Sequence, residues 1–108
     1  MSKPVVSVYQ FKLNSSAVEK DFLAISDKVQ AFLTSKDGFL YRSVSKVSDG
    51  QWLDIVYWSN AEKLSAIDGE FESRPECKQF MAMIENDSVT VQRAEVFAMG
   101  GAAEAAAA

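Results

Sequence analysis

Apolar and polar residues alternate along four segments of the chain, and apolar residues recur every three or four positions in two other segments. The alternating segments are rich in β-branched and aromatic residues, which is typical of strands. The predicted strands run over residues 5–11, 39–47, 51–58 and 88–98. An apolar stripe with helical spacing predicts a first helix from about Ser16 to Ser35. A second helical region follows Ser59 and is interrupted before Pro75, because proline disfavours helix in the residue that precedes it.

Short local signals support the boundaries of these elements. Ser16 and Glu19 have the spacing of a capping box at the start of the first helix. Gly38 is placed to take the left-handed conformation after that helix ends. Asp49 and Gly50, between two β-rich segments, predict a tight hairpin turn.

The predicted order is βαββαβ, the split βαβ or ferredoxin-like pattern of an α+β protein. Such a chain forms a four-stranded antiparallel sheet with two helices on one face, which leaves the other face uncovered. The strand over 51–58 is largely apolar on both sides, unlike a half-solvated strand. One side carries Trp52, Asp54, Val56 and Trp58, and the other carries Leu53, Ile55 and Tyr57. A second copy of the sheet is the simplest cover, so we expect a homodimer formed through the sheet faces.

Length and composition fit one globular domain. The chain has 108 residues, of which 48% are hydrophobic and 24% are charged. We place the domain at residues 1–99. Residues 100–108 form a low-complexity, alanine-rich tail, to which we assign no function.

The charge balance argues against several partners. The net charge is −4, and the 11 lysines and arginines form no cluster of the kind that binds nucleic-acid phosphates. No apolar run approaches the roughly 20 residues that span a bilayer, and the first residues lack the apolar stretch of a signal peptide. We therefore expect no nucleic acid and no membrane among the partners, and a cytoplasmic location.

The chain contains no histidine and one cysteine, Cys77. The absence of histidine excludes Ser-His-Asp and Cys-His catalysis. It also removes the commonest ligand of zinc and haem, so we expect no metal. A single cysteine forms no disulfide within the chain.

Three stretches carry a resemblance to a known family: Gly-Phe-Leu-Tyr-Arg-Ser at 38–43, Trp-Leu-Asp-Ile-Val-Tyr-Trp at 52–58, and Phe-Met-Ala-Met-Ile at 80–84. In this order they resemble the antibiotic-biosynthesis monooxygenase-like group within the dimeric α+β barrel superfamily. The resemblance covers roughly residues 4–98. It is a pattern specific to a fold, and the superfamily includes oxygenases, isomerases, haem-handling enzymes and proteins with no known reaction.

The resemblance implies two protomers whose sheets pack face to face, each with room for a ligand between its own sheet and helices. It also implies cofactor-free oxidation of electron-rich polycyclic aromatics, in which the substrate carbanion reacts with dioxygen. We accordingly expect no cofactor. Haem-degrading members hold iron through a histidine, which this chain lacks, and Arg93 stands near where some relatives place a histidine.

Asp54 is the strongest candidate for a catalytic residue. A carboxylate between Trp52 and Trp58 in a buried strand is expected to be paired or to have a raised pKa. A raised pKa suits a general base that deprotonates a phenol or an enol. Arg42, on the neighbouring strand of the hairpin, is the expected partner of Asp54, either as a structural cross-strand pair or as a group that binds a substrate oxyanion.

We predict two sets of site residues on this basis. The catalytic set is Asp54, Arg42 and Tyr57. The substrate-binding set is Tyr9, Tyr41, Trp52, Trp58 and Met83. The rings equally suit core and dimer-interface packing, and the methionine suits the core between helix and sheet. We further expect a surface pair of Arg93 with Glu95, and solvated loops at Asp68, Glu70 and Glu72.

The leading functional hypothesis is a cofactor-independent monooxygenase that acts on a small aromatic or polyketide-like molecule. One alternative is a non-catalytic small-molecule-binding or stress-related dimer. Another is a lyase or isomerase that uses the same acid-base residues.

Overall fold

The computed structural model of the chain describes residues 3–47 and 50–100. The first residues of the predicted hairpin turn, including Asp49, lie outside the described residues, as does the alanine-rich tail from residue 101 onward.

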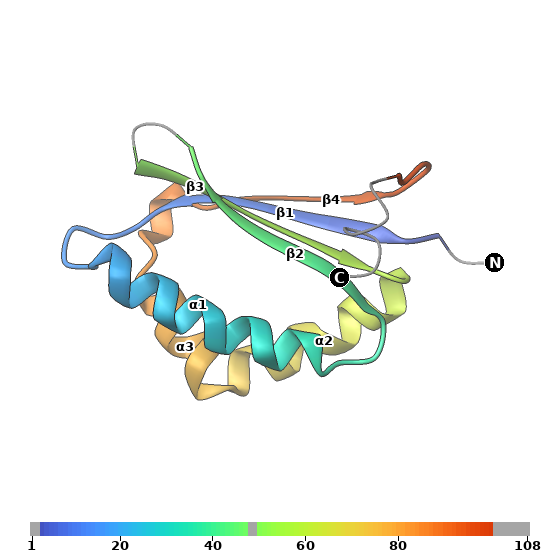
Figure 1. Cartoon of the computed structure of the whole chain (residues 1–108), viewed down its shortest axis with the longest axis horizontal. Helices are drawn as coiled ribbons and strands as arrows, with labels where there is room; N and C mark the ends of the chain where they lie inside the picture. Colours follow the sequence, from blue (N-terminus) through green and yellow to red (C-terminus); the bar gives the residue numbers. More distant parts are fainter. Residues whose placement is uncertain (1–2, 48–49, 101–108) are drawn as a thin grey trace.

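The described residues form a four-stranded antiparallel sheet with helices on one face (Figure 1). The elements in chain order are β1 (Val5–Lys12), α1 (Glu19–Thr34), β2 (Phe39–Lys46), β3 (Gln51–Trp58), α2 (Ala61–Ser73), α3 (Pro75–Ala82), the 3₁₀ turn η2 (Asn86–Ser88) and β4 (Thr90–Glu95). The strand order in the sheet is β2-β3-β1-β4. This arrangement confirms the predicted α+β, ferredoxin-like fold.

Two element boundaries and the number of helices differ from the sequence prediction. Helix α1 begins after Val18, which is extended and makes no side-chain cap, while the Ser16 hydroxyl donates to Asn14 Oδ1 at 2.9 Å. The predicted capping box is therefore wrong. The break predicted before Pro75 is confirmed, because Arg74 is held extended there, and the two pieces are separate helices. Among the described residues, three helices therefore cover the sheet, where the fold prediction had two. Strand β4 is shorter than predicted at both ends.

Gly38 takes the conformation predicted for it, with a φ of +89°. Its carbonyl oxygen accepts a hydrogen bond from the Ser59 backbone N–H at 2.7 Å, which ties the start of β2 to the end of β3. A Cβ at this position would lie 2.5 Å from Cγ of Lys63. Glycine is therefore required here both by the backbone angle and by the space.

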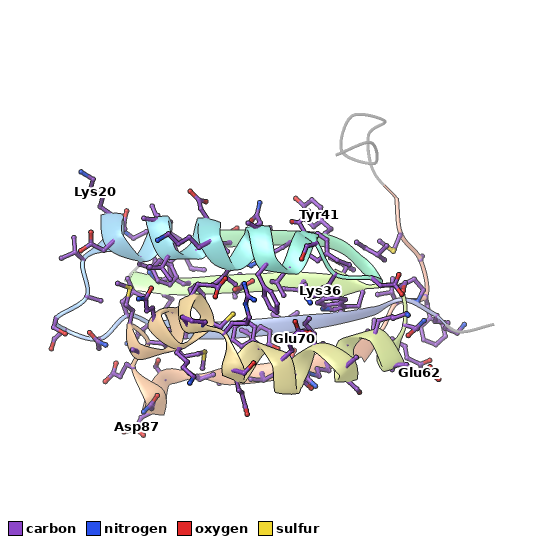
Figure 2. All side chains as sticks on the ribbon, turned by 90° about the horizontal axis from the view of Figure 1, so that it is seen from below. Lys20, Lys36, Tyr41, Glu62, Glu70 and Asp87 are labelled. Carbon is purple, nitrogen blue, oxygen red and sulfur yellow. The ribbon has the colours of Figure 1, made fainter. Side chains whose placement is uncertain are left out.

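The helices lie side by side across the sheet, with α1 over β2 and β3 and with α2 and α3 over β1 and β4 (Figure 2). Between α1, α3 and the sheet, an aromatic cluster packs at centroid distances from 5.0 to 6.2 Å. Its members are Phe11, Phe22, Trp52 and Phe80, all at least nine-tenths buried. This cluster fills the end of the molecule where α3 meets the sheet.

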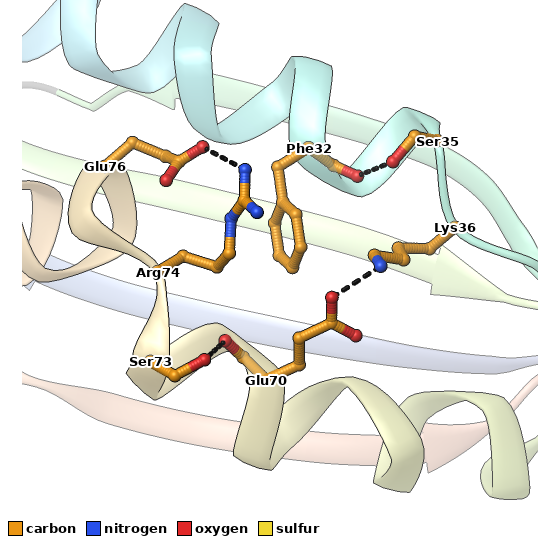
Figure 3. Close-up of polar contacts among 7 residues, drawn as sticks. All are labelled: Phe32, Ser35, Lys36, Glu70, Ser73, Arg74 and Glu76. Carbon is orange, nitrogen blue, oxygen red and sulfur yellow. Dashed lines mark hydrogen bonds and ion pairs between the residues drawn. The ribbon is translucent and has the colours of Figure 1, made fainter.

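On the outer side of the helices, charged side chains surround the buried ring of Phe32 and form an outer seam between the helices (Figure 3). Arg74 and Lys36 approach the ring of Phe32 at 4.9 and 5.2 Å. Lys36 pairs with Glu70 of α2, and Arg74 pairs with Glu76 at 3.0 Å. These cations are partly exposed and already matched by carboxylates, so the seam contributes to helix packing and offers little to a ligand.

The sheet face opposite the helices is apolar and, in the part of the chain described, bare. Leu53, Ile55 and Tyr57 of β3 are half-buried there, and the ring of Tyr41 packs against that of Tyr57 at 6.3 Å. Val6 and Val8 of β1 extend the same surface, which is referred to below as the open face. Among the described residues, no helix combines the length and the apolar character needed to cross a bilayer.

Candidate functional site

A cavity of about 660 Å³ lies between the sheet and helices α2 and α3. Its floor is the helix-facing side of β1, β3 and β4, and its roof is formed by side chains of the two helices. The lining residues include Ser7, Tyr9, Phe11, Asp54, Val56, Trp58, Leu64, Ile67, Phe71, Cys77, Phe80 and Met81. A cavity of this size with a mostly apolar lining is typical of small-molecule sites. Charged side chains also line it, namely Asp68, Glu72, Lys78 and Arg93.

Asp54 reaches this cavity while held by Arg42 through two hydrogen bonds. Arg42 Nε donates to Oδ1 at 3.1 Å, and Arg42 Nη2 donates to Oδ2 at 3.0 Å. Arg42 Nη1 donates to the backbone carbonyl of Ser26 on α1 at 3.1 Å. The Arg42 side chain is 1% exposed and the Asp54 side chain 9% exposed. This bidentate geometry fixes the carboxylate in one orientation at the cavity floor.

The buried position of Asp54 controls its protonation. Burial raises the pKa of the Asp54 carboxyl above its ordinary value, and the charge and hydrogen bonds of Arg42 oppose that rise. The carboxylate therefore stands in a place where accepting a proton is easier than it is in water. That is the property a general base requires.

Ser7 adds a second polar group to the cavity floor. Its side chain is 1% exposed, and its hydroxyl oxygen has no hydrogen-bond partner among the described residues. The sequence prediction missed Ser7, although its place in β1, between the apolar Val5 and the aromatic Tyr9, was a signal. A small polar residue on the core side of a strand is expected to have a partner.

The rim of the cavity carries a charged bridge between β4 and α2. Arg93 donates to both carboxylate oxygens of Asp68, at 3.0 and 3.1 Å, and to the Tyr9 hydroxyl oxygen at 3.3 Å. The predicted pair of Arg93 with Glu95 is therefore wrong. The loops predicted at Asp68, Glu70 and Glu72 are also wrong, because the helical region continues through Gly69 and all three residues lie on α2.

The structure brings some of the predicted site residues together and separates others. Asp54, Tyr9 and Trp58 line the cavity. Arg42 stands behind Asp54, Trp52 belongs to the aromatic cluster, and Met83 packs at the end of α3 outside the cavity lining. Tyr41 and Tyr57 lie on the open face, because side chains alternate along a strand. They cannot contact a ligand bound beside Asp54 in the same protomer.

Cys77 lines the cavity from α3 and is fully buried. Burial raises the pKa of its thiol to about 11, so the thiol stays protonated at neutral pH. It contributes to the apolar wall and offers no nucleophile. The described part of the chain also holds no cluster of carboxylate or thiol side chains with the makings of a metal site.

No family model matches the sequence, and no curated protein sequence is significantly similar to it. Solved structures are similar. A variant of SnoaB, a cofactor-independent oxygenase from Streptomyces nogalater, superposes with a TM-score of 0.72 over 91% of this chain and 97% of that one, at 12% identity. A candidate antibiotic biosynthesis monooxygenase from Bordetella bronchiseptica gives 0.70 over 89% and 99%, at 10% identity. Rv0793 from Mycobacterium tuberculosis gives 0.68 over 91% and 99%, at 16% identity.

The chain has the SnoaB-like fold. The resemblance to the antibiotic-biosynthesis monooxygenase-like group is thus confirmed for the architecture. At identities of 10 to 16%, the SnoaB-like fold alone carries no substrate or reaction across to this chain.

Proposed function

We propose that this protein binds a small aromatic or polyketide-like molecule in the cavity above Asp54 and oxidises it with dioxygen, without a cofactor. The observation that carries the proposal is the Asp54 carboxylate, more than nine-tenths buried, fixed by Arg42 and lining an apolar cavity of about 660 Å³. SnoaB, whose structure is similar, is named as a cofactor-independent oxygenase, and this similarity of fold supports the proposal.

The chemistry begins with proton removal. The Asp54 carboxylate accepts a proton from an acidic CH₂ group of a bound anthrone-like molecule, and the electron pair delocalises into the ring system as an enolate. The electron-rich anion then reacts with dioxygen. Overall, the CH₂ group and O₂ give a carbonyl group and one water molecule, so one oxygen atom enters the substrate and the other leaves with both hydrogens.

Arg42 has a different role here from the one the sequence suggested. It does not line the cavity, and its guanidinium nitrogens are used by Asp54, the Ser26 carbonyl and Gln30 Oε1. Arg42 therefore orients the carboxylate and keeps it available for the substrate proton. Trp58 shapes the apolar wall beside it, and the Tyr9 hydroxyl lies at the rim.

A non-catalytic binding protein is the second candidate, and the Arg42–Asp54 geometry favours it in one respect. Both carboxylate oxygens already accept hydrogen bonds from Arg42, as in a purely structural ion pair. Ligand binding in the cavity without turnover would select this function. Product formed equally well without oxygen would select a lyase or isomerase.

We also propose that two copies of the chain pair through the open face. Half-buried Leu53, Ile55 and Tyr57, with the exposed Tyr41, form an apolar surface that one protomer leaves in water. Ile55→Asp should shift the mass measured by analytical ultracentrifugation from dimer to monomer. A wild-type protein that is monomeric at high concentration would overturn the pairing. A cytoplasmic location stays a prediction.

The decisive experiment is oxygen uptake by the purified protein with anthrone. Wild type should consume dioxygen above the rate of uncatalysed autoxidation, and Asp54→Asn should lose at least about 100-fold of that excess rate, the lower range for removal of a general base. Asp87→Asn, an exposed carboxylate on η2, is the matched control and should behave as wild type. No excess uptake by wild type with anthrone or related phenols would remove the enzymatic part of the proposal.

A further inference from the structure

Polar side chains that are buried in a cavity and lack a partner often mark where a ligand is recognised, because leaving them unpaired is unfavourable. Among the described residues that line the cavity, Ser7 and Asp54 are the polar side chains more than nine-tenths buried. Asp54 is paired with Arg42. The Ser7 hydroxyl has no partner at all among the described residues.

The neighbours of Ser7 in the sheet explain why its hydroxyl is left free. Ser7 is paired across β3 with Val56, which offers no polar atom, and across β4 with Arg93. The Arg93 guanidinium is turned toward helix α2, where it binds Asp68, and it also donates to the Tyr9 hydroxyl of β1. Arg93 only donates hydrogen bonds, so even a guanidinium turned toward Ser7 could donate to the hydroxyl oxygen but could not accept the Ser7 proton.

The same register places Ser7 near Asp54 on the cavity floor. Asp54 is paired with Tyr9, two residues along β1 from Ser7, so Ser7 and Asp54 are diagonal neighbours on one face of adjacent strands. Such neighbours are about 7 to 8 Å apart between their backbones, close enough for one small molecule to contact both. The floor thus presents an acceptor and, beside it, a hydroxyl donor.

We propose that Ser7 is the specificity-determining residue of this cavity and donates a hydrogen bond to a ligand oxygen, selecting ring molecules that carry a ketone or phenolic oxygen over plain hydrocarbons. The inference rests on the proposed function, and deepens it by naming the substrate class. When Asp54 removes a proton from the bound molecule, the electron pair moves onto that oxygen as an enolate. The Ser7 hydroxyl then stabilises the developing negative charge that Arg42, facing away, does not reach.

The test compares two ligands of the same shape, tetralin and its ketone 1-tetralone, by isothermal titration calorimetry on the full chain. Wild type should bind the ketone more tightly. Ser7→Ala should weaken binding of the ketone about five-fold and leave tetralin unchanged, the effect of one neutral hydrogen bond. Ser65→Ala, on the exposed side of helix α2 and outside the cavity lining, is the matched control and should change neither affinity.

Thermal unfolding of the free protein supplies a second readout. Because the Ser7 hydroxyl is buried without a partner, Ser7→Ala should raise the Tm, by about 4 °C for a domain of this size. A drop in Tm would show that the hydroxyl has a structural partner, and would overturn the assignment. If Ser7→Ala weakens the binding of both ligands equally, or weakens the binding of neither, the assignment is overturned as well.

The outcomes separate this inference from the proposed function. If wild type and Ser7→Ala each bind the two ligands with the same affinity, the role of Ser7 is overturned. The cavity then still stands as a ligand site. Selective ketone binding that depends on Ser7, without oxygen uptake on anthrone, supports the role of Ser7 and removes the oxygenase activity. Failure of wild type to bind either ligand overturns both.

Discussion

The guanidinium of Arg42 and the carboxylate of Asp54 meet through two nearly equal hydrogen bonds, of 3.1 and 3.0 Å, across strands β2 and β3. The pair sits under helix α1 and beside the ring of Phe80, which lies 5.7 Å from the guanidinium carbon. One carboxylate therefore belongs to a buried ion pair and to the floor of a cavity at the same time.

Removing the arginine alone should be costly for folding. Arg42→Met leaves the Asp54 carboxylate buried without its counter-ion, and the loss in free energy of unfolding should be about 3 kcal/mol or more. The double variant Arg42→Met/Asp54→Leu removes both charges and should recover most of that loss. Urea unfolding followed by tryptophan fluorescence measures both. Equal stabilities of the single and double variants would show that the pair is not the source of the effect.

Burial of Asp54 should determine whether the stability of the protein rises or falls with pH. Its pKa in the folded protein is raised above the ordinary value of 3.8, so the folded state holds this proton more tightly than the unfolded chain does. The stabilising contribution of the group is thus fully present below pH 3.8 and is lost as the pH rises through the raised pKa. The free energy of unfolding of wild type relative to Asp54→Asn should fall over that interval. A rise would mean that Arg42 outweighs burial.

The Cys77 thiol should be a slow-reacting reporter of the cavity. Burial raises its pKa from 9.0 to about 11, so at pH 8 the folded protein holds roughly 100-fold less thiolate than the unfolded chain. Labelling by a disulfide reagent at pH 8 should be slower in the folded protein by at least that factor. Labelling in 8 M urea is the control. Comparable rates in both conditions would show that helix α3 opens readily.

Replacing two different glycines by alanine should change the stability of the fold in opposite directions. Gly38→Ala places a Cβ against Lys63 at a φ of +89°, and should destabilise the fold by about 2 kcal/mol or more. Gly69→Ala, on the exposed side of α2 with open space around it, should stabilise the fold by about 0.5–1 kcal/mol. Thermal unfolding of the two variants checks both. Destabilisation by both would point away from the geometry at Gly38.

Strand and helix order could be predicted from the sequence because periodicity reports which side chains a fold buries. The alternation over 51–58 correctly separated Trp52, Asp54 and Trp58 from Tyr57. The start of α1 was missed because Ser16 satisfies a neighbouring side chain, Asn14, in place of the helix backbone. Local sequence signals do not show which of two nearby polar partners a serine will choose.

The composition of the site was harder to predict than the fold. Arg42 and Asp54 were paired correctly, since a buried carboxylate needs a cation and the hairpin supplied one. Grouping Tyr41 and Tyr57 with Asp54 in one pocket is contradicted, because the two faces of β3 serve different surfaces. The link of Arg93 to Asp68 joins residues 25 positions apart on β4 and α2, a contact that depends on tertiary packing and that no spacing rule shows.

Strand β3 contributes to two different surfaces, because its odd-numbered and even-numbered side chains point to opposite faces of the sheet. Leu53, Ile55 and Tyr57 face outward, while Asp54, Val56 and Trp58 face the helices. Inserting or deleting a single residue near its start would exchange the two sets along the strand that follows. The carboxylate would then be presented to solvent and the leucine to the ligand. Descendants of this chain can therefore replace residues in β3 one at a time, but they cannot insert or delete one residue there without giving up both surfaces together.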